Sequence, residues 1–200
     1  MDAKFAAKRG YSSHKPPLPL YTEQDAIATV SRFREVAFRT QLDLGQGATA
    51  TFHPAGHILG AAFIDLQIGG KRILFTGDVG RPEHPALVGP DVIPGGHCDA
   101  LLTESTYGDR EHAPVTGDFE TVIRETCARG GSVLVPAFAV DRTEVLLYNL
   151  ARLARDGRLP AVPVFVDSPM ALAALRVYRT AIVEGRADIR DRKSTRLNSS

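Results

Sequence analysis

The chain has 200 residues, 44% of them hydrophobic and 24% charged, which is enough apolar material for the core of a globular domain. Its net charge of +1 excludes a basic field over the whole molecule, although a basic cleft on a neutral protein stays compatible with this value. Two cysteines, no apolar run of membrane length and no apolar signal core predict a cytoplasmic protein without a disulfide framework or a membrane span.

The first half of the chain is predicted to pass from one helix to a set of strands. The helix covers residues 21–38, begins with a capping box of Thr22 and Asp25, and has an inward face of Ala26, Ile27, Val30, Phe33 and Ala37. Strands are predicted at residues 48–53, 61–68, 71–78 and 99–104. The double glycine 69–70 between the second and the third strand predicts a hairpin.

The second half is predicted to alternate helices with strands, which indicates α/β layering. Helices are expected at residues 116–129, 142–155 and 169–182, and buried strands at residues 132–138 and 162–168. The double glycine 130–131 is expected to end the first of these helices. Ser168 and Pro169 are expected to be the N-cap and the first residue of the last one.

Acidic residues lie at or just after the ends of four of the predicted strands. Ligand sites of α/β proteins gather at the carboxyl ends of strands, where the sequence has Asp78, Glu104, Asp141 and Asp167. Aspartate at such a position also caps turns and helices, so each of these residues has a structural explanation as well.

His57 and Asp78 form the strongest candidate pair. A neutral imidazole is a preferred zinc ligand, and a carboxylate has two oxygens with which it can bridge two cations. A catalytic zinc site takes at least three ligands from the protein, however, and this pair supplies two. The residues by themselves therefore leave two interpretations of His57 open, a metal ligand and a hydrogen-bonded structural histidine.

Five motifs in one order give the chain a specific resemblance. They lie between about residues 17 and 190 and read HPAGHILGAA, LFTGDVGR, LLTESTYGDREH, GGSVLVPAFAVDRTEVLLY and VFVDSPMA. In this order they resemble the metallo-β-lactamase-fold nucleases of the β-CASP group, which include bacterial and archaeal ribonucleases and the endonuclease that cuts messenger RNA precursors. The resemblance implies an α/β fold, with a partial metallo-β-lactamase αββα sandwich at residues 1–108 and the first part of a β-CASP α/β domain at residues 109–190.

The resemblance also implies roles for single residues. His57 is expected to bind one zinc ion, and Asp78 to bridge two zinc ions at the catalytic centre. Glu104 is expected to orient a histidine that protonates the leaving group, and positions in the substrate cleft are implied for Ser105, Arg142 and Ser168. The implied reaction is zinc-dependent hydrolysis of phosphodiester bonds in single-stranded RNA, away from membranes, by a parent protein that forms a homodimer.

The chain departs from the family pattern in its histidines. The family motif His-x-His-x-Asp-His is absent, and so are two histidines that follow the capping domain in the family. Four other histidines are interpreted as structural residues, with His53 in a turn: His53, His84, His97 and His112. We therefore expect an inactive fragment. Two other functions stay open, hydrolysis of another substrate by the same fold and RNA binding without catalysis.

The last ten residues, 191–200, resemble the in-frame translation of a sequencing-library adapter and are expected to be a non-native tail. Without the three basic residues and the one acidic residue of this stretch, 21 basic and 22 acidic residues remain. The native part of the chain is thus expected to be almost neutral.

Overall fold

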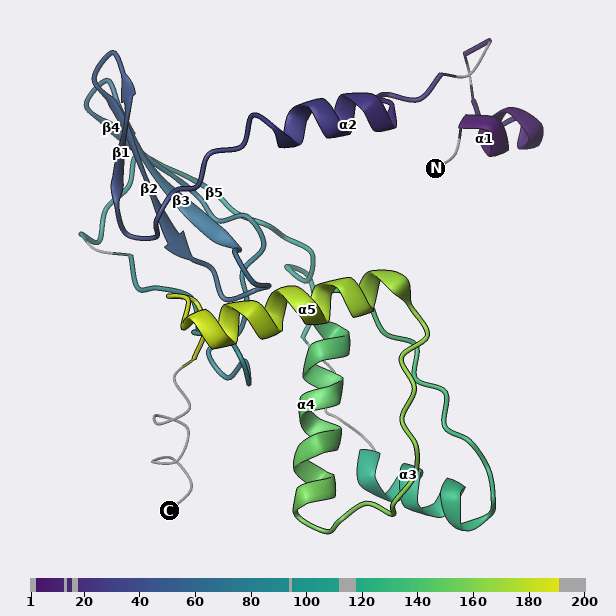
Figure 1. Ribbon diagram of the computed structural model, residues 1–200. Coiled ribbons are helices and arrows are strands. Elements are labelled where there is room, and N and C mark those ends of the chain that lie inside the picture. Colours follow the sequence, from purple (N-terminus) through teal and green to yellow (C-terminus); the bar gives the residue numbers. More distant parts are fainter. Residues whose placement is uncertain (1–2, 13, 16–17, 94, 112–117, 191–200) are drawn as a thin grey trace. The chain divides into compact units, whose positions relative to one another are not determined.

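The computed structural model describes residues 3–12, 14–15, 18–93, 95–111 and 118–190 (Figure 1). The chain divides into two compact units, Met1–Val36 and Ala37–Ser200. The expected adapter-derived tail and His112 lie outside the described residues. The proposed domain boundary after residue 108 stays a prediction.

The N-terminal unit contains two helices, α1 (Ala3–Arg9) and α2 (Glu23–Val30). The predicted capping box of α2 is confirmed, since the Thr22 hydroxyl accepts the Asp25 amide at 3.3 Å and the Asp25 carboxylate accepts the Thr22 amide at 2.7 Å. The predicted length and inward face are wrong, because the helix ends at Val30 and none of its residues is buried. An apolar helix face becomes a buried face only where another layer packs on it, and the described residues of this unit supply none.

The second unit begins with a sheet of five strands in the order β1-β2-β3-β4-β5. The strands are β1 (Gln41–Gly45), β2 (Ala48–Pro54), β3 (Ala62–Ile68), β4 (Lys71–Phe75) and β5 (Ala100–Leu102). The first three pairs are antiparallel, whereas β5 is parallel to β4. The four strands predicted for the first half of the chain are present as β2 to β5, and β1 was not predicted.

The predicted hairpin between β3 and β4 is confirmed. Gly69 and Gly70 connect the two strands with φ values of 58° and 72°. A two-residue connection with positive φ at both positions matches the right-handed twist of the strands, and glycine adopts it without strain. The double glycine therefore sets the register that pairs Ile68 with Lys71.

The sheet buries one charged pair along with its apolar side chains. Asp65 of β3 is 7% exposed, and its carboxylate accepts hydrogen bonds from the Arg72 guanidinium, the shortest at 2.7 Å. These hydrogen bonds and the nearby negative charge raise the pKa of Arg72, so the guanidinium stays charged. A buried carboxylate needs such a partner, because an unpaired charge in this place would be very costly.

Arg72→Leu is expected to lower the free energy of unfolding by about 3 kcal/mol, because it leaves the Asp65 carboxylate buried and unpaired. Urea denaturation of the 200-residue chain measures this change. The control is Lys71→Leu, at the residue before Arg72 on β4. It removes an exposed ion pair between Lys71 and Asp99 and should cost far less. Equal losses for the two variants would contradict the importance of the buried pair.

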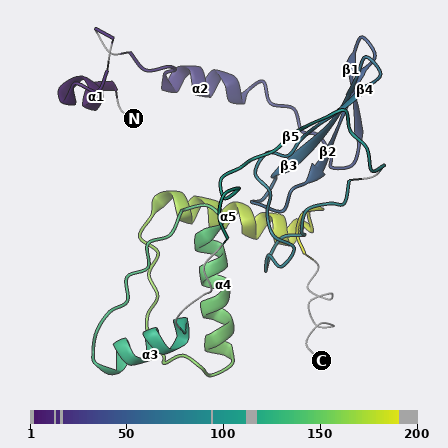
Figure 2. The same ribbon diagram turned by 180° about the vertical axis from the view of Figure 1, so that it is seen from behind.

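Three helices complete the second unit (Figures 1 and 2). They are α3 (Phe119–Ala128), α4 (Arg142–Arg155) and α5 (Pro169–Glu184), close to the predicted bounds. The Ser168 hydroxyl accepts the Ala171 amide at 3.2 Å, which confirms the predicted N-cap of α5. None of the helices in the described ranges is long and apolar enough to cross a membrane.

The two strands predicted between these helices are not formed. Residues 132–138 and 162–168 run as irregular segments, in which Leu134 is 93% exposed and Phe165 is 85% exposed. An apolar run becomes a buried strand only beside another strand that satisfies its backbone hydrogen bonds. Within the described residues, the five-stranded sheet supplies no such neighbour for either run.

Candidate metal centre

One edge of the sheet collects the loops that carry the predicted site residues. Pro54 at the end of β2 pairs with Ala62 at the start of β3, and Phe75 at the end of β4 pairs with Leu102 at the end of parallel β5. The loops that follow β2, β4 and β5 therefore leave the sheet at the same edge. This edge faces α5 in both ribbon views (Figures 1 and 2).

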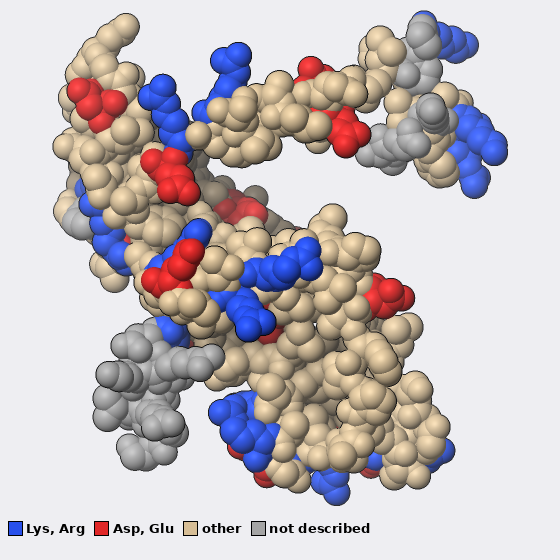
Figure 3. All heavy atoms as spheres, viewed as in Figure 1, with Lys and Arg blue, Asp and Glu red and all other residues tan. Residues whose placement is uncertain are grey.

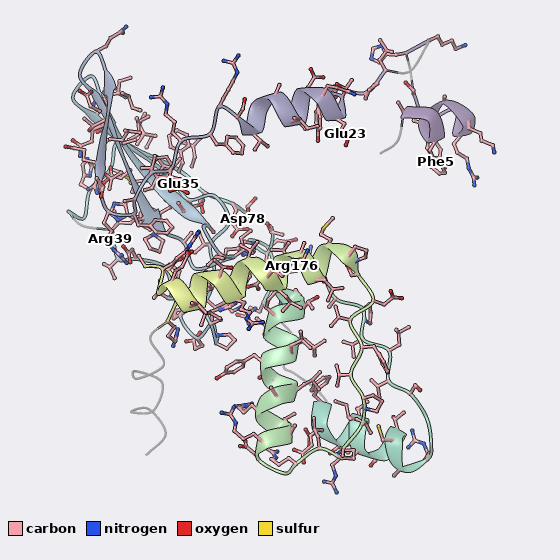
Figure 4. All side chains as sticks on the ribbon, in the orientation of Figure 1. Phe5, Glu23, Glu35, Arg39, Asp78 and Arg176 are labelled. Atoms are coloured by element: carbon pink, nitrogen blue, oxygen red, sulfur yellow. The ribbon has the colours of Figure 1, made fainter. Side chains whose placement is uncertain are left out.

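These three loops contain His57, Asp78 and Glu104. β4 ends at Phe75 and β5 at Leu102, so Asp78 and Glu104 lie in loops and not within the longer strands that were predicted. Gly77, with φ of 54°, turns the chain away from β4 just before Asp78. Figure 4 labels Asp78, which lies at the end of the sheet close to α5.

Close backbone contact joins the loop of His57 to the loop of Asp78. The Gly80 amide donates to the Ala55 carbonyl at 2.8 Å. A Cβ atom on Gly80 would lie 1.7 Å from the carbonyl oxygen of Gly56, far inside contact distance. Only glycine at position 80 allows this approach, so the two glycines bring the candidate ligands together.

The side chains of His57 and Asp78 face each other in solvent. The His57 Nε2 atom lies 3.8 Å from the Asp78 Oδ2 atom, and the side chains are 43% and 69% exposed. An imidazole nitrogen and a carboxylate oxygen are the donor types that zinc takes in proteins, so the pair fits a metal centre in its chemistry. Among the described residues, however, no group of three or more histidine, cysteine or acidic side chains could hold a metal ion.

Glu104 connects the third loop to the Asp78 loop. Its Oε1 atom accepts the Val79 amide at 2.7 Å, and its Oε2 atom accepts the Thr106 hydroxyl at 2.8 Å. The Val79 hydrogen bond, followed by the one from Thr106 and the nearby charge of His57, lowers the pKa of Glu104. Glu104 is therefore a carboxylate at neutral pH and acts as a hydrogen-bond acceptor.

The three predicted substrate-cleft residues lie in different surroundings. Ser105 directly follows Glu104, and its carbonyl accepts the Gly108 amide in a tight turn. Arg142 is the first residue of α4 and lines a cavity of about 900 Å³ beside α3, whereas the Ser168 hydroxyl caps α5. The structure thus places Ser105 in the same loop as Glu104, whereas Arg142 and Ser168 lie at the beginnings of helices.

Two of the remaining histidines have structural partners. His53 is stacked on Phe63 with ring centroids 4.9 Å apart, and its Nδ1 atom lies 3.6 Å from Asp91 Oδ2. It lies within β2, so the predicted turn position is wrong. His84 Nε2 lies 2.8 Å from Asp141 Oδ1, and both side chains are largely buried.

Sequence reasoning missed two residues that hold the His57 loop. The Tyr178 hydroxyl accepts the Leu59 amide at 3.1 Å, and the Asp188 carboxylate accepts the Gly60 amide at 2.8 Å. Tyr178 shares the buried face of α5 with Ala171 and Ala181. The helical spacing of these three residues marks an inward polar group and is the signal that could have found Tyr178.

The charge distribution gives little further indication of a partner. On the face of the molecule drawn in Figure 3, the basic and acidic side chains of the described residues are interspersed. This agrees with the net charge of +1 in the sequence.

The chain is similar to proteins named ribonucleases. It is 36% identical over 163 residues to ribonuclease TTHA0252 of Thermus thermophilus, a match that covers 80% of this chain and 37% of that protein. It is 33% identical over 175 residues to endoribonuclease YSH1 of Gibberella zeae, covering 86% of this chain and 21% of that protein. It is 34% identical over 167 residues to cleavage and polyadenylation specificity factor 73 of Drosophila melanogaster, covering 82% and 24%. No family model matches the chain.

These matches cover most of this chain and less than two fifths of each relative. The five ordered motifs of the sequence resemble the same family, and the loops that carry three of them meet at one sheet edge. Over most of its length the chain is homologous to metallo-β-lactamase-fold nucleases of the β-CASP group.

Proposed function

We propose that the protein is a zinc-dependent nuclease that cleaves phosphodiester bonds in single-stranded RNA. The observation that carries this proposal is the His57–Asp78 pair, 3.8 Å apart, at the edge where β2, β4 and β5 end. The names of the related proteins, which describe ribonucleases and endoribonucleases, support RNA as the substrate.

In this proposal, His57 would hold one zinc ion through Nε2, and Asp78 would bridge two zinc ions through its two carboxylate oxygens. Zinc, when bound, would supply Lewis-acid stabilisation of phosphate charge and acidify water for attack. Glu104 is ionised, so it cannot give the leaving oxygen a proton and would instead orient a protonated histidine. Ser105 beside Glu104, with Arg142 and Ser168, would contact RNA.

The described residues supply two zinc ligands, which is fewer than a catalytic zinc site takes from protein. We therefore propose that the 200 residues alone bind zinc weakly and are inactive, and that activity needs further ligands. A partial metallo-β-lactamase domain up to residue 108, followed by part of a β-CASP domain, and a homodimer of the active protein belong to the same proposal. The two free cysteines support a location in the cytoplasm.

Zinc titration with a labelled single-stranded RNA tests this proposal. The 200-residue chain is expected to leave the RNA intact, whereas a form of the protein with the full ligand set should cleave it, and EDTA should stop the cleavage. Cleavage that continues in EDTA would contradict metal dependence. Hydrolysis of a thioester or a lactam without cleavage of RNA would replace the proposed substrate class.

A further inference from the structure

The loop that carries His57 is held from α5 through its backbone. The Leu59 amide donates to the Tyr178 hydroxyl at 3.1 Å, and the neighbouring Gly60 amide donates to the Asp188 carboxylate at 2.8 Å. Leu59 is two residues from His57 within the loop that connects β2 and β3. Two consecutive backbone amides of this loop thus depend on side chains more than a hundred residues further along the chain.

The loop is short and its ends are joined by hydrogen bonds, so a hydrogen bond that holds Leu59 also restrains His57. The Ala55 amide donates to the Ala61 carbonyl at 2.9 Å, and the Ala61 amide donates to the Ile58 carbonyl at 3.0 Å. With its ends joined in this way, the loop has little freedom to move at one residue and not at the next. A shift of the Leu59 amide would therefore move the His57 side chain.

The Tyr178 hydroxyl is itself oriented by a chain of hydrogen bonds. Tyr178 is 5% exposed and donates its one hydroxyl proton to Asp141 Oδ1 at 3.1 Å, which leaves a lone pair for the Leu59 amide. His84 Nδ1 accepts the amides of Ala86 and Leu87, so the proton of the ring is on Nε2 and points to the same Asp141 oxygen.

Asp141 is committed to this chain of hydrogen bonds. It precedes α4 at the N-cap position, yet its side chain makes no capping hydrogen bond, and its backbone has an unusual φ of 69°. Burial alone would raise the pKa of Asp141, but the hydrogen bonds from His84 and Tyr178 help to lower it overall. Asp141 is therefore an ionised acceptor that fixes the direction of the Tyr178 hydroxyl.

The second hydrogen bond to the His57 loop, from the Gly60 amide to Asp188, comes from the segment that follows α5. Asp188 is 7% exposed, and its backbone carbonyl accepts the Val88 amide at 2.9 Å while its carboxylate holds Gly60. The Arg190 amide donates to the Ala86 carbonyl at 2.9 Å, two residues further along. The segment after α5 thus connects the His57 loop to the loop that contains His84.

We propose that Tyr178 is a positioning residue for His57, with Asp188 as the second anchor of the loop, so that α5 helps to set the place of a zinc ligand outside the helix. The role in catalysis rests on the proposed function, whereas the effect on His57 does not. Metal ligands must be held within about 0.5 Å of their working geometry by the residues behind them. The His57 side chain is exposed, so few neighbours can hold it directly. The hydrogen bonds to the Leu59 and Gly60 amides would hold its backbone instead.

Tyr178→Phe tests the proposal, since it removes one oxygen and keeps the ring. In the 200-residue chain, the exchange rate of the Leu59 amide should rise about 10-fold, as expected for the loss of one ordinary hydrogen bond. The ¹⁵N signals of the His57 ring should shift, and their response to added zinc should weaken. In a form that cleaves RNA, kcat should fall about 10-fold with KM for RNA unchanged, since effects on residues behind a metal ligand start at this size.

Tyr148→Phe on α4 is the matched control, because it makes the same change on a tyrosine that is 40% exposed. His57 signals that respond alike in the two variants would overturn the proposal. If Tyr178→Phe does not fold, Asp188→Ala is the deciding variant. The exchange rate of the Gly60 amide and the ¹⁵N signals of the His57 ring are then measured. A shift of these signals supports the proposal, and unchanged signals overturn it. Shifted His57 signals, together with no RNA cleavage by a form that carries the full ligand set, would support the positioning role and remove the proposed nuclease function.

Discussion

Replacing Asp78 by alanine is expected to lower metal-dependent RNA cleavage by more than about 100-fold, because the loss of a group that only orients a metal ligand already costs about 10- to 100-fold. Asp78 would do more than orient, since its two oxygens would bridge the two zinc ions. It is 69% exposed, so its loss should leave the fold and the unfolding transition almost unchanged. The effect therefore belongs to the site and not to stability.

The measurement is cleavage of a labelled single-stranded RNA by a form of the protein that shows activity, with bound zinc determined in the same samples. Asp156→Ala is the matched control, since Asp156 ends α4 at an exposed position and should leave cleavage unchanged. Asp78→Asn keeps the size and one oxygen acceptor, and it should restore zinc binding only in part. Full activity of Asp78→Ala would contradict the assignment of Asp78 as a metal ligand.

Gly80→Ala is expected to lower the free energy of unfolding by about 3 kcal/mol, near the upper end for overpacking a tight contact. The new Cβ atom would lie 1.7 Å from the Gly56 carbonyl oxygen and 2.4 Å from the His57 amide nitrogen. Backbone atoms cannot rotate away as a flexible side chain can, so the two loops must separate. The separation would also move His57 away from Asp78.

Thermal or urea unfolding measures this loss, and the zinc response of the His57 ring measures the separation of the ligands. Gly108→Ala is the control, because a Cβ atom there would meet its nearest neighbour, the Ser105 Cβ atom, at 3.4 Å, an ordinary contact. It should fold and bind zinc like the parent chain. A Gly80→Ala protein as stable as this control would show that the two loops are not held in close contact.

The sequence predicted the local structure well where the signal lies within a few residues. The capping box of Thr22 and Asp25, the double glycine between β3 and β4, and Ser168 at the beginning of α5 all formed as expected. Each depends on hydrogen bonds or backbone angles of neighbouring residues, which the order of amino acids specifies directly. These elements therefore needed no knowledge of the rest of the fold.

The sequence was misleading where an apolar pattern needed a partner far along the chain. The runs at residues 132–138 and 162–168 have the composition of buried strands, but they remain exposed and unpaired in the described structure. The apolar face predicted for α2 is exposed for the same reason, since burial depends on a packed neighbour and not on the pattern itself.

The candidate site divides along the same line. His57, Asp78 and Glu104 were predicted at or just after strand ends, and strand pairing brings these ends to one edge. Their roles came from the family resemblance and stay predictions. The residues that hold the His57 loop could not be found from strand ends. Asp141 was interpreted as one more acid at a strand end, and Tyr178 and Asp188 were not considered. Their role comes from contacts such as Leu59 with Tyr178, across 119 positions of the chain.

The sequence by itself thus determined α3, α4 and α5, the hairpin between β3 and β4 and four strands of the sheet. It also named the one imidazole and two acidic groups that meet at the sheet edge as candidates. The tertiary structure alone decided that Gly80 packs against Gly56 and that α5 holds the His57 loop. The physical reason is range: propensities and caps act over one or two turns, whereas ligand positions are set by hydrogen bonds between residues that only folding brings together.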